Sequence, residues 1–119
     1  MSVTIEGKTL VERHLAVWNA PAGEERAAGI AALYSPDVVI GEPEALLAGH
    51  DGMTRAIDGL QSMMPGMALA LQGPIQTTQD MTTYRWTLGS PGGDPVVRGR
   101  DVITVGDGLI SSVYVFIDS

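Results

Sequence analysis

Three separated polar residues of this chain could carry out acid/base chemistry: His14, Glu42 and Asp101. His14 lies between Val11 and Leu15 on the apolar stripe of an expected helix, so its ring should face the core or a cavity. A neutral imidazole can donate to a developing oxyanion or accept a proton near neutral pH. A core histidine bonded to the backbone is the alternative that this pattern leaves open.

Glu42 is the second candidate, and its neighbours leave two interpretations open. It follows an expected strand and directly precedes Pro43. If the loop from Glu44 to Gly49 covers it, desolvation would raise its pKa and make it a usable base. Otherwise it is a solvated loop end, where carboxylates are common.

Asp101 is the candidate with the most support from the local pattern. The two-residue alternation of an expected strand places it on the same face as Ile103 and other apolar residues, whereas Arg98 and Arg100 fall on the opposite face. A carboxyl group on an apolar inner face is costly unless it is neutral or paired. Asp101 therefore has either a role in a site or a structural role such as bonding a helix end.

Helical periodicity predicts three helices that would position these residues. The first two should form a hairpin, and the third has four large apolar residues on one face. Proline or glycine terminates each of the three patterns. The expected helices are Lys8–Asn19, with a start near Thr4 and an end before Pro21, then Glu24–Tyr34, then a segment that begins at an Asp51 cap and ends at Pro65.

Segments rich in β-branched and aromatic residues predict the sheet. One short strand precedes the third helix, and everything after Pro65 has strand character. Gly106-Asp107-Gly108 has the chemistry of a tight hairpin. Helices followed by antiparallel strands predict an α+β domain with helices on one face of the sheet. The expected strands are Asp37–Gly41, Met67–Leu71, Met81–Leu88, Val96–Val105 and Leu109–Asp118.

Composition narrows the possible partners. The 119 residues suit one domain, with 45% apolar residues, 18% charged residues and a net charge of −7. This charge would repel nucleic-acid phosphates and anionic membranes, so a neutral, mostly apolar small molecule is the expected ligand. Without cysteine, metal-ligand spacing or a phosphate-binding loop, neither a metal nor another cofactor is expected. The chain lacks an apolar run of membrane-spanning length, and a cytoplasmic location is the default expectation.

Four short motifs resemble the NTF2-like superfamily, most closely its SnoaL-like polyketide cyclase and ketosteroid isomerase-like members. They occur in the family's order and together span nearly the whole chain. The resemblance implies a single domain over residues 1–119, in which three helices pack on a curved antiparallel sheet that encloses a cone-shaped cavity. The motifs are Arg13–Ala20, Leu33–Val39, Ala48–Met53, and Gly99–Ile103 continuing through Asp107–Ile110.

The resemblance also implies roles for the three polar residues. His14 occupies the position of a tyrosine that follows the first helix's arginine in the isomerase pattern, while Glu42 resembles the catalytic carboxylate and Asp101 the second acid. Glu42 would then abstract a proton next to a carbonyl, and the other two would donate hydrogen bonds to the enolate oxygen. Such a cofactor-independent site could run an isomerisation or an intramolecular aldol cyclisation.

Apolar and aromatic residues are expected to line the pocket beside these groups, although packing in the core explains them equally well. An exposed strand face carrying Tyr114 and Phe116 favours a homodimer through the outer face of the sheet. The expected substrate-binding residues are Trp18, Met53, Tyr84, Trp86, Ile103 and Val113.

Three other functions remain open. The first is a small-ligand-binding or accessory protein without chemistry of its own, which the histidine in place of tyrosine favours. The second is a dimerisation module whose cavity is plugged by side chains. The third is an epoxide hydrolase of the limonene-epoxide type, which requires an arginine on the face of Asp101, whereas Arg98 and Arg100 are expected to point away unless Gly99 forms a bulge.

Overall fold

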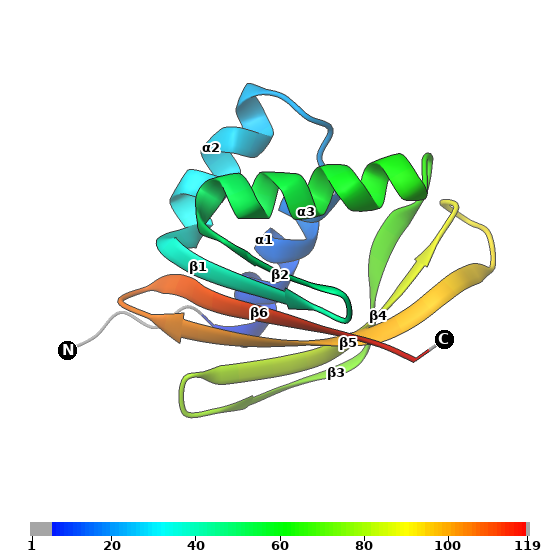
Figure 1. Cartoon of the computed structure of the whole chain (residues 1–119). Coiled ribbons are helices and arrows are strands. Elements are labelled where there is room, and N and C mark those ends of the chain that lie inside the picture. Colours follow the sequence, from blue (N-terminus) through cyan, green and yellow to red (C-terminus); the bar gives the residue numbers. More distant parts are fainter. Residues whose placement is uncertain (1–5, 119) are drawn as a thin grey trace.

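The computed structural model describes residues 6–118, which form three helices and six strands (Figure 1). Two helices come first, two strands precede the third helix, and four strands complete the chain. In order, the elements are α1 (Gly7–Asn19), α2 (Glu24–Leu33), β1 (Tyr34–Glu42), β2 (Ala45–Ala48), α3 (Gly49–Met63), β3 (Ala68–Thr78), β4 (Met81–Gly89), β5 (Pro95–Gly106) and β6 (Leu109–Ile117).

The six strands form one curved sheet in the order β2-β1-β6-β5-β4-β3. All neighbours are antiparallel except β1 and β6, which run parallel with Ile40 opposite Val113. Strand β2, helix α3 and strands β3 to β5 lie between β1 and β6 in the chain, so no hairpin constrains the relative direction of β1 and β6. A register shift between Gln72 and Gln76 interrupts the pairing of β3 with β4, and such irregularities bend a sheet.

The helices lie on the concave side of this sheet (Figure 1). α1 packs on β3, while α3 packs on β1 and β2. The apolar stripe of α1 is buried as its periodicity predicts, with Leu10 and Val11 almost completely covered. The predicted α+β architecture of three helices packed on a curved sheet is confirmed, with one difference: the sheet is mixed rather than wholly antiparallel.

Two predicted helix boundaries differ from the structure. Tyr34 was expected to end the second helix, but it is the first residue of β1. The prediction that Asp51 caps the third helix is wrong, because α3 begins at Gly49 and Ala48 occupies the N-cap position without a side-chain hydrogen bond. Asp51 instead lies in the first turn, where its charge still interacts favourably with the helix dipole. The expected start near Thr4 lies outside the described residues, and α1 begins at Gly7.

The segment after Glu42 was expected to be a loop, but it contains strand β2. Only four residues long, it pairs with the end of β1, so that Glu42 faces Ala45 across a turn at Pro43 and Glu44. Its composition, Ala-Leu-Leu-Ala, carries no β-branched signal. The pairing therefore depends on contact with β1 and not on local propensity.

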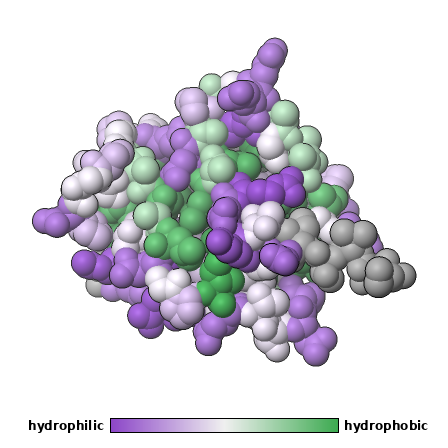
Figure 2. Space-filling view, turned by 180° about the vertical axis from the view of Figure 1, so that it is seen from behind, coloured by the Kyte–Doolittle hydropathy of each residue, from purple (hydrophilic) through white to green (hydrophobic). Residues whose placement is uncertain are grey.

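The last hairpin forms as predicted, with Asp107 and Gly108 both at positive φ in the turn between β5 and β6. On β6, Tyr114 and Phe116 are exposed, and the homodimer through this face stays a prediction. Figure 2 shows, on the side of the molecule opposite to that of Figure 1, apolar residues reaching the surface within a mostly hydrophilic surround. No helix within residues 6–118 is long and apolar enough to cross a membrane.

Candidate functional site

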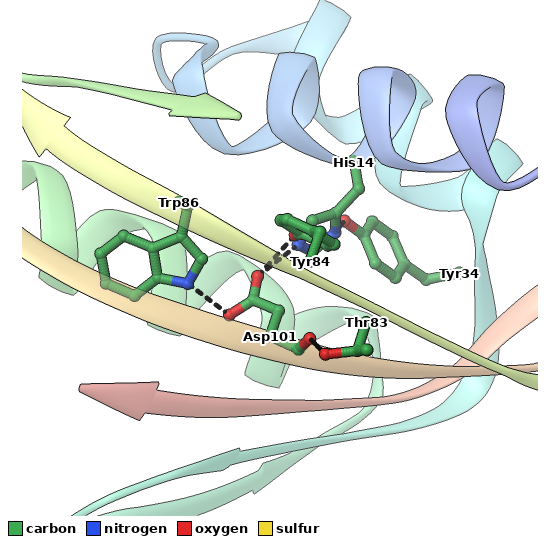
Figure 3. A network of polar contacts seen from close by, with 6 residues as sticks. All are labelled: His14, Tyr34, Thr83, Tyr84, Trp86 and Asp101. Carbon is green, nitrogen blue, oxygen red and sulfur yellow. Dashed lines mark hydrogen bonds and ion pairs between the residues drawn. The ribbon is translucent and has the colours of Figure 1, made fainter. Parts of the chain in front are cut away.

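Asp101 lies at the centre of a buried polar network beneath α1 (Figure 3). The Tyr84 hydroxyl donates to Oδ2 at 2.6 Å, and the Trp86 indole N–H donates to Oδ1 at 2.8 Å. Nε2 of His14 lies 3.3 Å from Oδ2. The carboxyl group thus has three donor groups around its two oxygens, an arrangement that a carboxylate satisfies because it only accepts hydrogen bonds.

Side chains along β5 point alternately to the two faces of the sheet, and this alternation turns Asp101 inward. Asp101 is 5% exposed and shares its face with buried Gly99 and Ile103. Its cross-strand partner is Tyr84 on β4. Because side chains directly opposite each other in an antiparallel pair project to the same side, this register brings the phenol hydroxyl to the carboxylate.

His14 is held between Asp101 and a second tyrosine. Its Nδ1 lies 2.5 Å from the hydroxyl of Tyr34, and the residue is 1% exposed. With Asp101 as acceptor, Nε2 carries a proton, and Nδ1 of a neutral ring accepts from the Tyr34 hydroxyl. Both ring nitrogens are therefore engaged within the protein.

Both phenols of the network remain donors over the physiological pH range. Burial raises the pKa of Tyr34 well above its ordinary value; Trp18 opposes this rise and the charge of Asp101 adds to it. Burial likewise raises the pKa of Tyr84, with further contributions from the charge and hydrogen bond of Asp101. Neither hydroxyl can readily lose its proton, so both act as hydrogen-bond donors within the network.

A cavity of about 320 Å³ lies between α3 and the sheet, and Asp101 lines it. Glu42 contributes a second carboxyl group to the same cavity, while most of the wall is apolar. The lining residues are Glu42, Pro43, Leu47, Arg55, Ala56, Gly59, Leu60, Met63, Leu69, Trp86, Asp101, Val115 and Ile117.

Glu42 is partly buried at the end of β1, and burial raises the pKa of its carboxyl group. The β1–β2 turn and the wall of the cavity remove part of its hydration, which disfavours the charged form. A partly desolvated carboxylate is a stronger proton acceptor than a hydrated one, so Glu42 has the physical property that a general base requires.

We expect Glu42→Gln to stabilise the protein at neutral pH. Because the raised pKa favours proton binding to the folded state, the wild-type carboxyl stabilises the fold most below its unfolded pKa of about 4.3 and loses this contribution as the pH rises through the folded pKa. The variant should therefore melt at a higher temperature than the wild type above that range, and the two should converge at about pH 4. Thermal melts of both, with Glu44→Gln as the exposed control, measure this difference; equal melting temperatures throughout would contradict it.

The structure brings two of the three predicted catalytic residues into contact and places the third at the same cavity. His14 bonds to Asp101, and Glu42 and Asp101 both line the cavity, which His14 does not reach. Of the predicted substrate-binding residues Trp86 lines the cavity. The other five are buried in the core and are absent from its wall: Trp18, Met53, Tyr84, Ile103 and Val113.

Two residues at the site escaped the sequence analysis. Tyr34, which bonds to His14, was expected only as the end of the second helix and as part of the family motif Leu33–Val39, with no role in the site. Arg55 on α3 lines the cavity, and a solvent-facing arginine in a helix gives no signal of such a position. The predicted parity of β5 does hold, because Arg98 is exposed and Arg100 donates to Thr83 Oγ1, both away from Asp101.

Residues 11–113 match the model of the SnoaL-like domain. The chain belongs to the SnoaL-like family. This confirms the predicted resemblance, and a solved SnoaL-like family protein from Agrobacterium tumefaciens, provisionally described as an isomerase, agrees with it. The two chains are 27% identical, with a TM-score of 0.88 over 95% of this chain and 97% of the other.

More distant structures share the SnoaL-like fold. A Sinorhizobium meliloti protein provisionally described as a polyketide cyclase is 15% identical, with a TM-score of 0.73, covering 90% of this chain and 93% of that one. A Kribbella flavida protein provisionally described as a ketosteroid isomerase is 21% identical, with a TM-score of 0.73, covering 95% and 78%. No curated protein matches this SnoaL-like sequence. The catalytic roles of its polar residues stay predictions.

Proposed function

We propose that this SnoaL-like protein catalyses proton transfer next to a carbonyl group of a small, mostly apolar molecule, without a cofactor. The reaction is an isomerisation or an aldol-type cyclisation. The observation that carries the proposal is that Glu42 and Asp101, two carboxyl groups with different surroundings, line one largely apolar cavity. Acid and base roles divide naturally between carboxyl groups whose environments differ in this way.

Glu42 is the proton acceptor in this proposal. Its carboxylate abstracts a proton from the carbon next to the carbonyl, which leaves the electron pair of the broken C–H bond in an enolate. In an isomerisation, the same group returns the proton to another carbon of the conjugated system. Partial burial supports this role, because it raises the pKa of the carboxyl toward the pH at which it must both take and release a proton.

Asp101 supports the enolate, and His14 acts through it as a positioning residue. The pair can hold one proton either as imidazolium and carboxylate or as imidazole and carboxylic acid. As negative charge develops on the substrate oxygen, the imidazolium form of His14 gives its Nε2 proton to Asp101 and keeps its second proton on Nδ1, which donates to the Tyr34 hydroxyl oxygen. The O–H of Asp101 then turns toward the substrate oxygen and donates to it. The 3.3 Å contact between Nε2 and Oδ2 supports this relay. Direct donation by His14, which the resemblance implies, would require Nε2 to leave Asp101 and the ring to reach the cavity.

Ligand binding without chemistry is the second candidate, and one observation favours it. His14 and Asp101 are bonded to each other and to two tyrosines, as the members of a purely structural buried network would be. In that case the cavity binds a molecule and releases it unchanged.

A cyclic β,γ-unsaturated ketone distinguishes the two candidates. The wild-type protein should convert it to the conjugated isomer, which is followed by ultraviolet absorbance. In deuterated water it should also catalyse deuterium incorporation next to the carbonyl of saturated cyclic ketones, measured by nuclear magnetic resonance. Binding of these ketones with neither isomerisation nor exchange would reject the enzyme proposal and leave the binding protein.

We expect Gly59→Phe to abolish turnover without unfolding the protein. Gly59 lies on α3 at the cavity, and a Cβ atom there would meet no heavy atom within 4 Å apart from its chain neighbours and the nearby backbone of its own helix. A phenylalanine side chain has room to enter and fill the space, and leaving glycine should raise helix stability by a few tenths of a kcal/mol or more. Gly59→Ala is the matched control and should retain activity. Normal turnover by a folded Gly59→Phe variant would show that the reaction does not use this cavity.

A further inference from the structure

Arg55 is a basic side chain in the wall of the candidate cavity, and the proposed proton transfer does not use it. It is the only cation among the described residues that line the cavity, where it is accompanied by the carboxyl groups of Glu42 and Asp101. The whole chain has only 7 lysine and arginine residues against 14 acidic ones. A positive charge at this position is therefore a local exception to the negative charge of the protein.

The helix that carries Arg55 offers it two acidic partners, and neither is used. Asp51 precedes it by four residues and Asp58 follows it by three, the spacings at which helical ion pairs form. Asp58 instead accepts from Arg26, with 2.6 Å between Nη1 and Oδ1. Within residues 6–118, Arg55 forms no ion pair with either acid. Its guanidinium therefore remains available to a bound molecule.

We propose that Arg55 binds a carboxylate of the ligand, so that the molecule entering the cavity is an apolar acid and not a neutral compound. This inference rests on the proposed use of the cavity as a ligand site, but not on any reaction there. The apolar wall of Leu60, Leu69 and Val115 would cover the body of the molecule. The guanidinium provides a planar pair of N–H donors that matches a carboxylate.

The charges around the cavity determine the orientation in which an acidic molecule binds. Glu42 and Asp101 repel an anion, so its carboxylate has a single favourable position, beside Arg55. The opposite end of the molecule is then directed toward the carboxyl groups. Arg55 thus determines both the class of ligand and its orientation, which changes the expectation of a neutral ligand drawn from net charge alone.

Calorimetric titration with naphthoate and with the neutral naphthamide tests this inference independently of catalysis. These probes share an apolar body and differ in the carboxylate. The wild-type protein should bind naphthoate about tenfold to a hundredfold more tightly, the range expected for a charge-assisted hydrogen bond. Arg55→Gln should remove this preference and leave the affinity for naphthamide unchanged, whereas Arg55→Lys should keep part of it.

Arg98→Gln is the matched control, because it removes the same charge from an exposed residue on the far face of β5. It should keep the preference for naphthoate. Equal affinities for the two probes in the wild type, no binding of naphthoate, or an equal loss of preference in Arg98→Gln would each overturn the role of Arg55. Failure to isomerise ketones would overturn the proposed function alone and would leave the binding result intact.

Discussion

Asp101→Ala should lower the free energy of unfolding by about 3–5 kcal/mol, the range for breaking a buried charged network from one side. The substitution removes the acceptor of Tyr84 and Trp86 and the partner of His14, and each of these three residues is at most 5% exposed. Each donor left without its acceptor loses a hydrogen bond and does not gain full access to water in exchange. The small cavity left by the carboxyl group adds to this cost.

Urea denaturation of the wild type and of Asp101→Ala measures the effect. Asp94→Ala is a suitable control, because Asp94 lies exposed in the loop between β4 and β5, where substitutions change stability by about 0.5 kcal/mol or less. A loss of less than about 1 kcal/mol for Asp101→Ala, similar to that of the control, would mean that the three donors find other partners.

Asp101→Asn should cost less than Asp101→Ala. The amide oxygen can accept from Trp86, and the amide N–H groups can reach Tyr84 and His14 only if the latter two act as acceptors. His14 would then move its proton to Nδ1 and donate to the Tyr34 hydroxyl. The network can be satisfied after this change of tautomer, but the shared proton between residues 14 and 101 is lost. Asp101→Asn therefore separates stability from the proposed relay.

The inward positions of Asp101 and His14 could be predicted from the sequence, because each residue lies in a long element with a clear hydrophobic periodicity. Alternation along β5 and the helical stripe of α1 identify inward positions from neighbours only a few residues away. The contact between Asp101 and Tyr84 is different, because it requires the register of β4 against β5. Tyr84 and Trp86 could be assigned to one strand face from the sequence, but nothing local specifies what lies opposite them.

The parts of the site that the sequence did not reveal depend on contacts between distant segments. Tyr34 reaches His14 because β1 begins where the helical pattern was expected to continue. β2 exists because β1 is there to pair with it, and this pairing partly buries Glu42. Arg55 reaches the cavity through the packing of α3 on the sheet. In each case tertiary contact, and not periodicity, determines the position.

Glu42→Gln should lower turnover of the ketone substrate by about a hundredfold to ten-thousandfold, the usual contribution of a positioned general base. Glutamine keeps the size and hydrogen-bonding capacity of the side chain but cannot accept the proton from carbon. Ligand affinity should change little, because the apolar wall of the cavity stays intact. Glu44→Gln is the matched control, since Glu44 is an exposed carboxyl group two residues away in the same turn, and it should retain full activity.

The pH dependence of the rate identifies Glu42 more sharply than the loss of activity alone. Only the ionised carboxylate accepts a proton, so wild-type kcat/KM should fall as the pH decreases through the pKa of Glu42, which burial raises above that of a hydrated glutamate. The residual activity of Glu42→Gln should lack this acidic limb, while Glu44→Gln should keep it unchanged. If Glu42→Gln is also the more stable protein at neutral pH, its lost activity cannot come from a damaged fold. An acidic limb that persists in Glu42→Gln would assign the base to another group, and Asp101 is then the remaining carboxyl group in the cavity wall.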